Sequence, residues 1–167
     1  MRGSGRFLPR TTEIVFVEWD PNFYAVLKNG VVIFASFTEE RTESNYKSDL
    51  AEKLERKLER YFSGKKEDFL EFEVSYPTAF SKRVLEEVRK IGFGETRSYG
   101  EIAGIVKTSP RAVGVALKMN KVPVIVPCHR VVAKNGLGGY SLGVDLKLKL
   151  LELEGAACVY RKGKGNL

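Results

Sequence analysis

Cysteine and histidine are scarce in the 167-residue sequence and glutamine is missing, and the scarcity of cysteine and histidine excludes two classes of site. Cysteine occurs only at Cys128 and Cys158, histidine occurs only at His129, and glutamine is absent. Two cysteines cannot build the disulfide framework of a small secreted domain. Together with one histidine they cannot supply the four ligands of a structural zinc site unless carboxylates join them. We therefore expect neither a disulfide scaffold nor a metal centre.

Long apolar runs are missing as well. No stretch approaches the ~20 residues that a helix needs to span a bilayer, and the polar segment Met1–Arg6 is too short for a secretory signal. Hydrophobic residues make up 43% of the chain and charged residues 29%, which is enough for one domain or two small ones with a buried core. We expect a globular protein in the cytoplasm.

Charge is distributed unevenly along the chain. Residues 1–77 contain 12 Lys and Arg against 14 Asp and Glu, a net charge of −2, whereas residues 78–167 contain 16 against 7, a net charge of +9. A surface without a charged partner more often scatters its charges evenly. The asymmetry therefore predicts a polyanion partner for the second half, with nucleic acid as the first candidate.

The first half has the pattern of a small α/β unit. Asn29-Gly30 suits the positive φ angles of a type I′ hairpin turn, and Asp49 with Glu52 three residues later predicts the start of a four-turn helix that ends at Gly64. Apolar or alternating runs predict strands at 14–17, 23–27, 31–37 and 70–74. No clustered titratable residues accompany them, so we interpret residues 1–77 as a scaffold.

A proline at Pro77 marks the predicted domain boundary, and Thr78 is suited to cap a helix that runs to Gly92. Two short helices follow, one opened by Ser98 and the other by Ser109-Pro110 and running to Met119. Their dimensions fit a helix-turn-helix or, equally well, a helical hairpin in a packed core. The predicted fold class is α+β, with an N-terminal α/β domain (1–77) and a mainly helical, winged-helix-like C-terminal domain (78–167).

The segment Pro123–Val132 places Cys128 and His129 side by side in an apolar, strand-like run between prolines. A lone cysteine is most often a small core residue. Burial in apolar surroundings makes a thiol inert unless a nearby histidine or cation stabilises the thiolate, and His129 and Arg130 are both adjacent. Neighbours in a strand point to opposite faces, however. Either the chain turns here or a water relays the proton.

Several motifs in order resemble the O6-alkylguanine-DNA alkyltransferase family. They are Ser109-Pro110-Arg111-Ala112-Val113-Gly114, Asn120, Pro127-Cys128-His129-Arg130-Val131-Val132, Gly139-Tyr140-Ser141 and Glu152-Leu153-Glu154-Gly155. The resemblance covers residues 78–157. It departs from the family at Lys121, which stands where a proline is common, and in the missing N-terminal zinc ligands.

The resemblance implies an alkyl transfer from O6 of a damaged guanine to Cys128, in a reaction that each molecule performs once and without a cofactor. His129 would take the thiol proton through a water, Glu154 would orient the imidazole, and Tyr99 would help to protonate the departing base. Substrate-binding positions of the family are matched by Asn120, Val131, Tyr140 and Ser141. DNA-binding positions are matched by Arg111, Ala112, Gly114, Lys118 and Arg130.

The implied partner is double-stranded DNA that contains O6-alkylguanine, bound by a monomer. Two other functions fit parts of the sequence. A winged-helix regulator in which Cys128 is only a core residue would explain the basic half, and a cysteine hydrolase would explain the Cys128–His129 pair. Cys158 lies beyond the last motif, and we interpret it as a packing residue or spectator thiol.

Overall fold

The structure, a computed structural model, describes residues 12–156. These residues form two compact units that divide between Ser75 and Tyr76. The predicted boundary at Pro77 lies two residues further along the chain. The scaffold role of the first unit and the DNA-binding role of the second stay predictions at this point. Cys158 and Met1–Arg6 lie outside the described residues.

The first unit is built on an antiparallel sheet in the order β1 (Thr12–Val17), β2 (Asn22–Lys28) and β3 (Val31–Thr38). Asn29 and Gly30 join β2 to β3 with φ angles of 52° and 80°, the left-handed region that a type I′ turn requires. The predicted hairpin is therefore confirmed. Every second residue of β2 is buried, so one face of the sheet carries the core of this unit.

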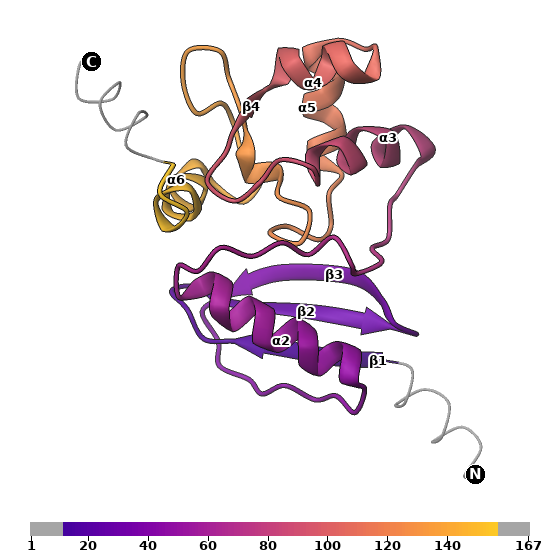
Figure 1. Cartoon of the computed structure of the whole chain (residues 1–167), viewed down its shortest axis with the longest axis vertical. Helices are drawn as coiled ribbons and strands as arrows, with labels where there is room; N and C mark the ends of the chain where they lie inside the picture. The colour runs from indigo at the N-terminus through magenta and orange to yellow at the C-terminus, as the bar shows by residue number, and fades with distance from the viewer. Residues whose placement is uncertain (1–11, 157–167) are drawn as a thin grey trace. The chain divides into compact units, whose positions relative to one another are not determined.

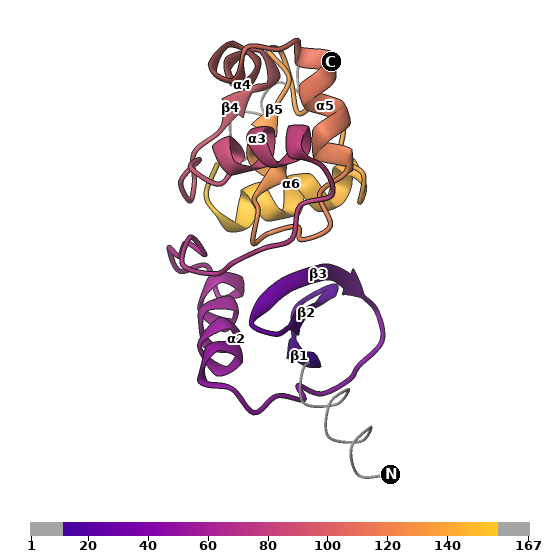
Figure 2. The ribbon, with the colours of Figure 1, turned by 90° about the vertical axis from the view of Figure 1, so that its right-hand side faces the viewer.

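Helix α2 (Asp49–Phe62) lies along the sheet, as Figures 1 and 2 show. Its N-cap is Ser48, whose hydroxyl accepts a hydrogen bond from the Ala51 N–H at 3.1 Å; the helix was predicted to begin with Asp49 as its cap. The N-cap is therefore one residue earlier in the chain than predicted. Serine and aspartate are about equally favourable at this position. Gly64, at φ 89°, follows the helix end as predicted.

The predicted strand over residues 70–74 is wrong. Only Val74 forms a β-bridge, with Val32, and the residues before it form a turn in which the Phe72 N–H bonds the Phe69 carbonyl at 3.1 Å. Phe69 and Phe72 are both buried while Leu70 is 56% exposed. Two buried aromatic residues three positions apart are typical of a turn and not of a strand. The alternation of charged and apolar residues in this segment therefore does not predict its structure.

The described part of the second unit, residues 76–156, contains four α-helices, one 3-10 turn and a pair of two-residue strands. Thr78 caps α3 (Ala79–Val88) through a capping box with Ser81, and this helix ends four residues before the predicted stop at Gly92. The other elements are β4 (Arg97–Ser98), α4 (Tyr99–Val106), α5 (Pro110–Lys118), the 3-10 turn η1 (Cys128–Arg130), β5 (Val131–Val132) and α6 (Val144–Leu153). The α+β fold class is confirmed.

Helices α4 and α5 form the predicted pair. Ser98 and Ser109 cap them by accepting hydrogen bonds from the N–H groups of Glu101 and Ala112. Lys107 ends α4 in the left-handed conformation at φ 60°, which turns the chain into α5. In Figures 1 and 2 the η1–β5 segment lies between this pair and α6.

The strands β4 and β5 pair in parallel, with Arg97 opposite Val131 and Ser98 opposite Val132. This short pairing fixes the start of α4 beside the residues that follow η1. Tyr99 is thereby held close to Cys128 although the two lie far apart in sequence. Among residues 12–156, no helix is long and apolar enough to cross a lipid bilayer.

Candidate active site

Cys128 occupies the first position of η1. The chain turns here, since the Arg130 N–H bonds the Pro127 carbonyl at 3.0 Å, so the strand-like interpretation of 123–132 is correct only for Val131–Val132. Cys128 is 6% exposed and lines a cavity of about 1280 Å³. That volume exceeds the roughly 300–1,000 Å³ of most small-molecule pockets because the cavity continues from the thiol to α5.

The Asn120 side chain holds the sulfur in place. Its amide Nδ2 donates to Cys128 Sγ at 3.2 Å and to the Val126 carbonyl at 3.0 Å, while its Oδ1 accepts from the Val122 N–H at 3.0 Å. The last of these bonds spans Lys121, so the backbone is fixed there without the proline common in the resembling family. A donor aimed at sulfur stabilises the thiolate.

Burial and the neighbouring polar groups have opposite effects on the pKa of the Cys128 thiol. Burial raises the pKa of the Cys128 thiol, whereas hydrogen bonds from Asn120 and Tyr140 and the charge of Lys147 act in the opposite direction. A thiol in such a place reacts only if a base removes its proton.

A buried network centres on Glu154. Its Oε2 lies 2.7 Å from His129 Nε2 and 3.0 Å from Arg130 Nη2, and its Oε1 accepts from Arg130 Nε at 2.9 Å and from the Gly94 N–H at 3.1 Å. Although burial alone would raise it, His129 and Arg130 hold the pKa of Glu154 well below its ordinary value. Glu154 is therefore an ionised carboxylate with four donors around it.

The ionised Glu154 sets the tautomer of His129. Because a carboxylate only accepts hydrogen bonds, the proton of neutral His129 resides on Nε2 and the lone pair on Nδ1. Burial lowers the pKa of His129 even though Glu154 acts in the opposite direction, so the ring is neutral at pH 7. The arrangement supplies a base whose orientation is fixed by a carboxylate.

Tyr99 begins α4 and borders the same cavity. Its hydroxyl donates to the Gly139 carbonyl at 3.3 Å, and burial raises its pKa, which keeps the proton on the oxygen. A Cβ at Gly138, whose φ is +73°, would lie 2.8 Å from Tyr99 Cε2. Glycine is thus required where the loop passes the ring. Tyr140 and Ser141 continue this loop and also line the cavity.

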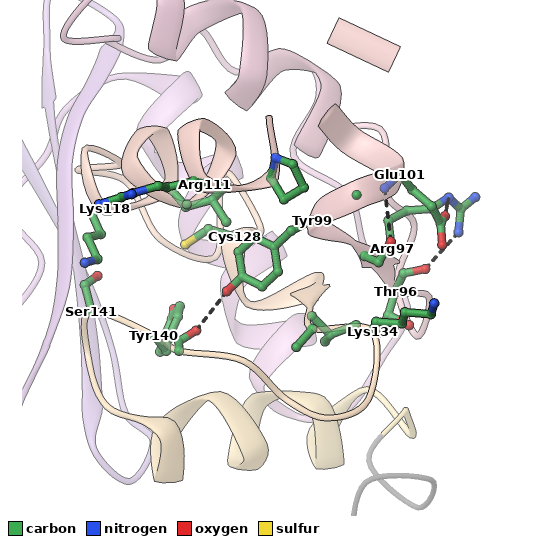
Figure 3. A pocket seen from close by; sticks show the side chains of 18 residues that line it. Thr96, Arg97, Tyr99, Glu101, Arg111, Lys118, Cys128, Lys134, Tyr140 and Ser141 are labelled. Atoms are coloured by element: carbon green, nitrogen blue, oxygen red, sulfur yellow. Dashed lines mark hydrogen bonds and ion pairs between the residues drawn. The ribbon is translucent and has the colours of Figure 1, made fainter. Parts of the chain in front are cut away.

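The predicted DNA-binding residues of α5 lie on one side of the cavity. Arg111 and Lys118 are exposed, and both line the cavity together with Gly114; Ala112 is half-buried. A side chain at Gly114 would meet nothing within 4 Å, so the fold itself does not need glycine there. Figure 3 shows Arg111 and Lys118 on one side of Cys128 and Tyr99, and Arg97 and Lys134 on the other.

Arg130, which was predicted to contact DNA, does not lie at the surface. It is 5% exposed, and its guanidinium is engaged by Glu154 and by the Ile91 carbonyl at 2.7 Å. The carbonyl of Val131, predicted to accept from the substrate, already accepts from Lys147 Nζ at 2.7 Å. A carbonyl oxygen has two lone pairs, so one remains for a ligand.

The sequence interpretation missed Lys147, which α6 presents to the interior. Lys147, Leu150, Leu151 and Glu154 are all buried, and their spacing is that of a helical apolar stripe. A lysine and a glutamate at stripe positions were the available signal. Arg130 was identified, but its role as a partner of Glu154 depends on a contact 24 residues away that no local pattern shows.

Comparisons with known proteins agree with this geometry. The family described as 6-O-methylguanine DNA methyltransferase, DNA binding domain, matches residues 79–156. A methylated-DNA–protein-cysteine methyltransferase of Metallosphaera sedula is 57% identical over 104 residues, which cover 62% of this chain and 67% of the relative. A protein of the same name from Archaeoglobus fulgidus is 42% identical over 149 residues, covering 83% of this chain and 97% of the relative.

Solved structures extend the similarity to both units. The Mycobacterium tuberculosis OGT in complex with DNA superposes with a TM-score of 0.71 at 32% identity, covering 86% of this chain and 93% of that one. The O6-methylguanine-DNA methyltransferase of the archaeon Pyrococcus kodakaraensis superposes with a TM-score of 0.66 at 30% identity, covering 85% and 99%.

Proposed function

The chain belongs to the 6-O-methylguanine DNA methyltransferase family, and we propose from this that it is a DNA repair protein that transfers the alkyl group of O6-alkylguanine to its own Cys128. One observation supports the proposal most: the Cys128 thiol lies at the cavity and is held by Asn120, and the next residue, His129, is paired with the buried carboxylate of Glu154. Within residues 12–156, no group of three His, Cys, Asp or Glu side chains lies close enough together to hold a metal ion.

The reaction is a displacement at carbon. His129 Nδ1 takes the thiol proton through a water, and the Cys128 thiolate forms a bond to the alkyl carbon as the bond from that carbon to O6 breaks. The electron pair of the broken bond stays on the guanine, and the Tyr99 hydroxyl supplies a proton to the departing base. Ser141 donates a hydrogen bond to O6, and the Val131 carbonyl accepts from the guanine amino group.

The product is a thioether on Cys128. The mechanism contains no step that removes an alkyl group from sulfur, so each molecule reacts once. No diffusible cofactor enters, because the nucleophile, the base and the acceptor are side chains of one chain. O6-Methylguanine is the principal substrate. Every group named here comes from the second unit, so one copy of the chain is sufficient for the reaction, and we propose that the protein acts as a monomer.

The lesion must leave the base stack to reach a buried thiol, at a cost of a few kcal/mol. Arg111, at the start of α5, fills the vacated space, since its planar cation can stack between bases and pair with their edges or with phosphate. The small residues Ala112 and Gly114 let the backbone of α5 approach the duplex, and Lys118 contacts a phosphate.

Intact mass after incubation with a duplex that bears O6-methylguanine tests the proposal. A transferase gains one stable methyl group in place of the thiol proton. A winged-helix regulator would show no change of mass, and a cysteine hydrolase would show at most a transient adduct.

A further inference from the structure

Val124 has a backbone conformation that valine seldom adopts. Its φ is 72°, and the residues other than glycine with positive φ among residues 12–156 are Asn29, Lys107 and Val124. Asn29 lies in a hairpin turn and Lys107 ends a helix, where this conformation is common. In valine the branched Cβ crowds the following carbonyl, so the conformation is strained. Such strain persists only where the surroundings impose it, and it is concentrated at functional sites.

Val124 lies in a buried turn that begins two residues after Asn120. The Val126 N–H bonds the Val122 carbonyl at 2.9 Å and closes the turn, and Val124 is 1% exposed. Pro123 fixes its own φ at about −65°. A proline followed by a residue of positive φ has the order of a type II turn, whose third residue is ordinarily glycine. Valine therefore occupies a position at which the backbone favours glycine.

Both ends of this turn are bound by one side chain, which also holds the nucleophile. Asn120 Oδ1 accepts from the Val122 N–H at 3.0 Å, and Asn120 Nδ2 donates to the Val126 carbonyl at 3.0 Å and to Cys128 Sγ at 3.2 Å. The Val126 carbonyl also accepts from the Cys128 N–H at 2.8 Å. A change in the shape of the turn therefore moves the amide and the sulfur relative to each other.

The side chain of Val124 offsets the strain of its backbone. Burial of a valine removes apolar surface from water, which stabilises the folded chain. A glycine at this position would adopt the left-handed conformation freely, but it would leave a gap in the core. The turn thus combines a backbone conformation typical of glycine with a side chain that anchors it.

We propose that Val124 is a positioning residue for alkyl transfer: its left-handed backbone sets the shape of the turn of residues 122–126, and this shape holds the Asn120 amide against the Cys128 sulfur. The inference rests on the proposed function for its role in repair. Its effect on the thiol does not need that function, so the two can be tested apart. If Val124 were only a core residue, the volume lost from its side chain would alone decide the effect of a substitution.

The first experiment compares the melting temperatures of Val124→Ala and Val124→Gly. Alanine is strained at positive φ and glycine is not, so Val124→Gly should melt no lower than Val124→Ala although it loses more of the side chain. Ile125 is 2% exposed and is not among the residues of positive φ. Ile125→Gly should therefore melt about 2–4 °C below Ile125→Ala, which makes these two variants the matched control.

The second experiment measures the pKa of the Cys128 thiol in the same proteins. The rate of alkylation by iodoacetamide is followed against pH, with peptide mass used to score Cys128 separately from Cys158. The hydrogen bond from Asn120 lowers the thiol pKa. Val124→Ala should displace this donor and raise the thiol pKa by about one unit, whereas Val124→Gly should stay close to wild type. Single-turnover reaction with the free base O6-benzylguanine at neutral pH should slow about tenfold in Val124→Ala and clearly less in Val124→Gly.

A double-mutant cycle tests whether Val124 acts through Asn120. Tyr140 and Lys147 also act on the thiol, and Tyr99 responds to its charge, but none of these three residues belongs to the turn. Asn120→Ala should raise the thiol pKa by itself. In that background Val124→Ala should raise the pKa no further, because the donor that it displaces is already missing. Additive effects on the pKa would contradict the inference.

A lower melting temperature or a higher thiol pKa in Val124→Gly than in Val124→Ala would overturn the inference, and so would a wild-type thiol pKa in Val124→Ala. If Val124→Ala does not fold, Val124→Gly decides alone through its thiol pKa. Failure of both variants to fold would also overturn the inference, because it requires that glycine is tolerated. A wild-type protein that transfers no methyl group from duplex DNA would instead contradict the proposed function, while the melting temperatures and the thiol titration would remain valid.

Discussion

His129 Nε2 lies 2.7 Å from Glu154 Oε2, and neither side chain is exposed to solvent. The carboxylate is also bound by Arg130 through two nitrogens. One carboxylate therefore orients the proposed base and at the same time neutralises a buried guanidinium. The proposed catalysis and the stability of the second unit therefore depend on the same side chain.

Glu154→Gln should lower both activity and stability. The amide cannot balance Arg130, and removing one partner of a buried ion pair costs about 3–5 kcal/mol. The amide can also donate to His129, which would place the ring proton on Nδ1 and remove the base. Urea unfolding should show the loss of stability, and the pH profile of reaction with O6-benzylguanine should shift to higher pH. Glu152→Gln, on the same helix, is the control, and an unchanged profile in Glu154→Gln would refute the relay.

His129 should make the second unit less stable in acid. Burial holds its pKa below the ordinary value of 6.5, so the unfolded chain binds its proton first as the pH falls. Stability is therefore lost from about pH 6.5 downward. The free energy of unfolding of His129→Gln should depend less steeply on pH between 7 and 5 than that of wild type. Equal slopes would mean that this histidine is not buried in its neutral form.

Arg111→Ala should separate flipping from chemistry. Repair of O6-methylguanine in a duplex should slow strongly, whereas reaction with the free base O6-benzylguanine should change little because no stack has to be opened. Lys118→Ala should only weaken duplex binding and reduce its salt dependence by about one unit of slope. If Arg111→Ala slowed the reactions with duplex DNA and with the free base equally, this arginine would serve the cavity or the stability of the fold, not base flipping.

Gly114→Ala should stabilise the protein and impair repair of duplex DNA. Glycine inside a helix costs roughly 0.5–1 kcal/mol relative to alanine, and a Cβ there meets nothing within 4 Å. The added methyl group would stand between α5 and the duplex, so only the duplex reaction should slow. Gly104→Ala in α4, where a Cβ is equally free, is the matched control. It should raise the melting temperature without an effect on repair, and the same behaviour of Gly114→Ala would remove this glycine from the DNA interface.

Local signals were sufficient for the elements that short-range rules govern. Asn29-Gly30 gave the hairpin, and Ser98, Ser109 and Pro110 gave the two short helices because caps and turns act within four residues. The predicted strand at residues 70–74 was wrong because an alternation of charged and apolar residues does not show which side chains are buried in the core. Phe69 and Phe72, three residues apart, are both buried.

The site residues that lie in the sequence motifs of the family could be predicted. Cys128, His129 and Glu154 come from the resemblance, and the structure brings them together with Asn120. Arg130 was matched to a DNA-binding position of the family, but the structure buries it. Arg130 can be buried because Glu154 balances its charge. Lys147 can be buried because three backbone carbonyls accept its hydrogen bonds. Both are long-range pairings that one sequence does not reveal.

Cys128→Ser should abolish alkyl transfer and leave duplex binding near normal. A hydroxyl has a similar size but is a far weaker nucleophile than a thiolate. Binding can be measured by fluorescence anisotropy with a labelled O6-methylguanine duplex, and transfer by loss of the methyl group from the DNA. Transfer that persists in this variant would move the chemistry to another residue, with Cys158 as the first to examine.

The most direct test of the account is the stoichiometry and position of the methyl group after reaction with excess duplex that contains O6-methylguanine. The account predicts one methyl group per protein molecule at completion, and peptide mass spectrometry should locate it on Cys128. More than one lesion repaired per molecule, or a methyl group on any other residue, would contradict the claim that Cys128 is the single-use acceptor.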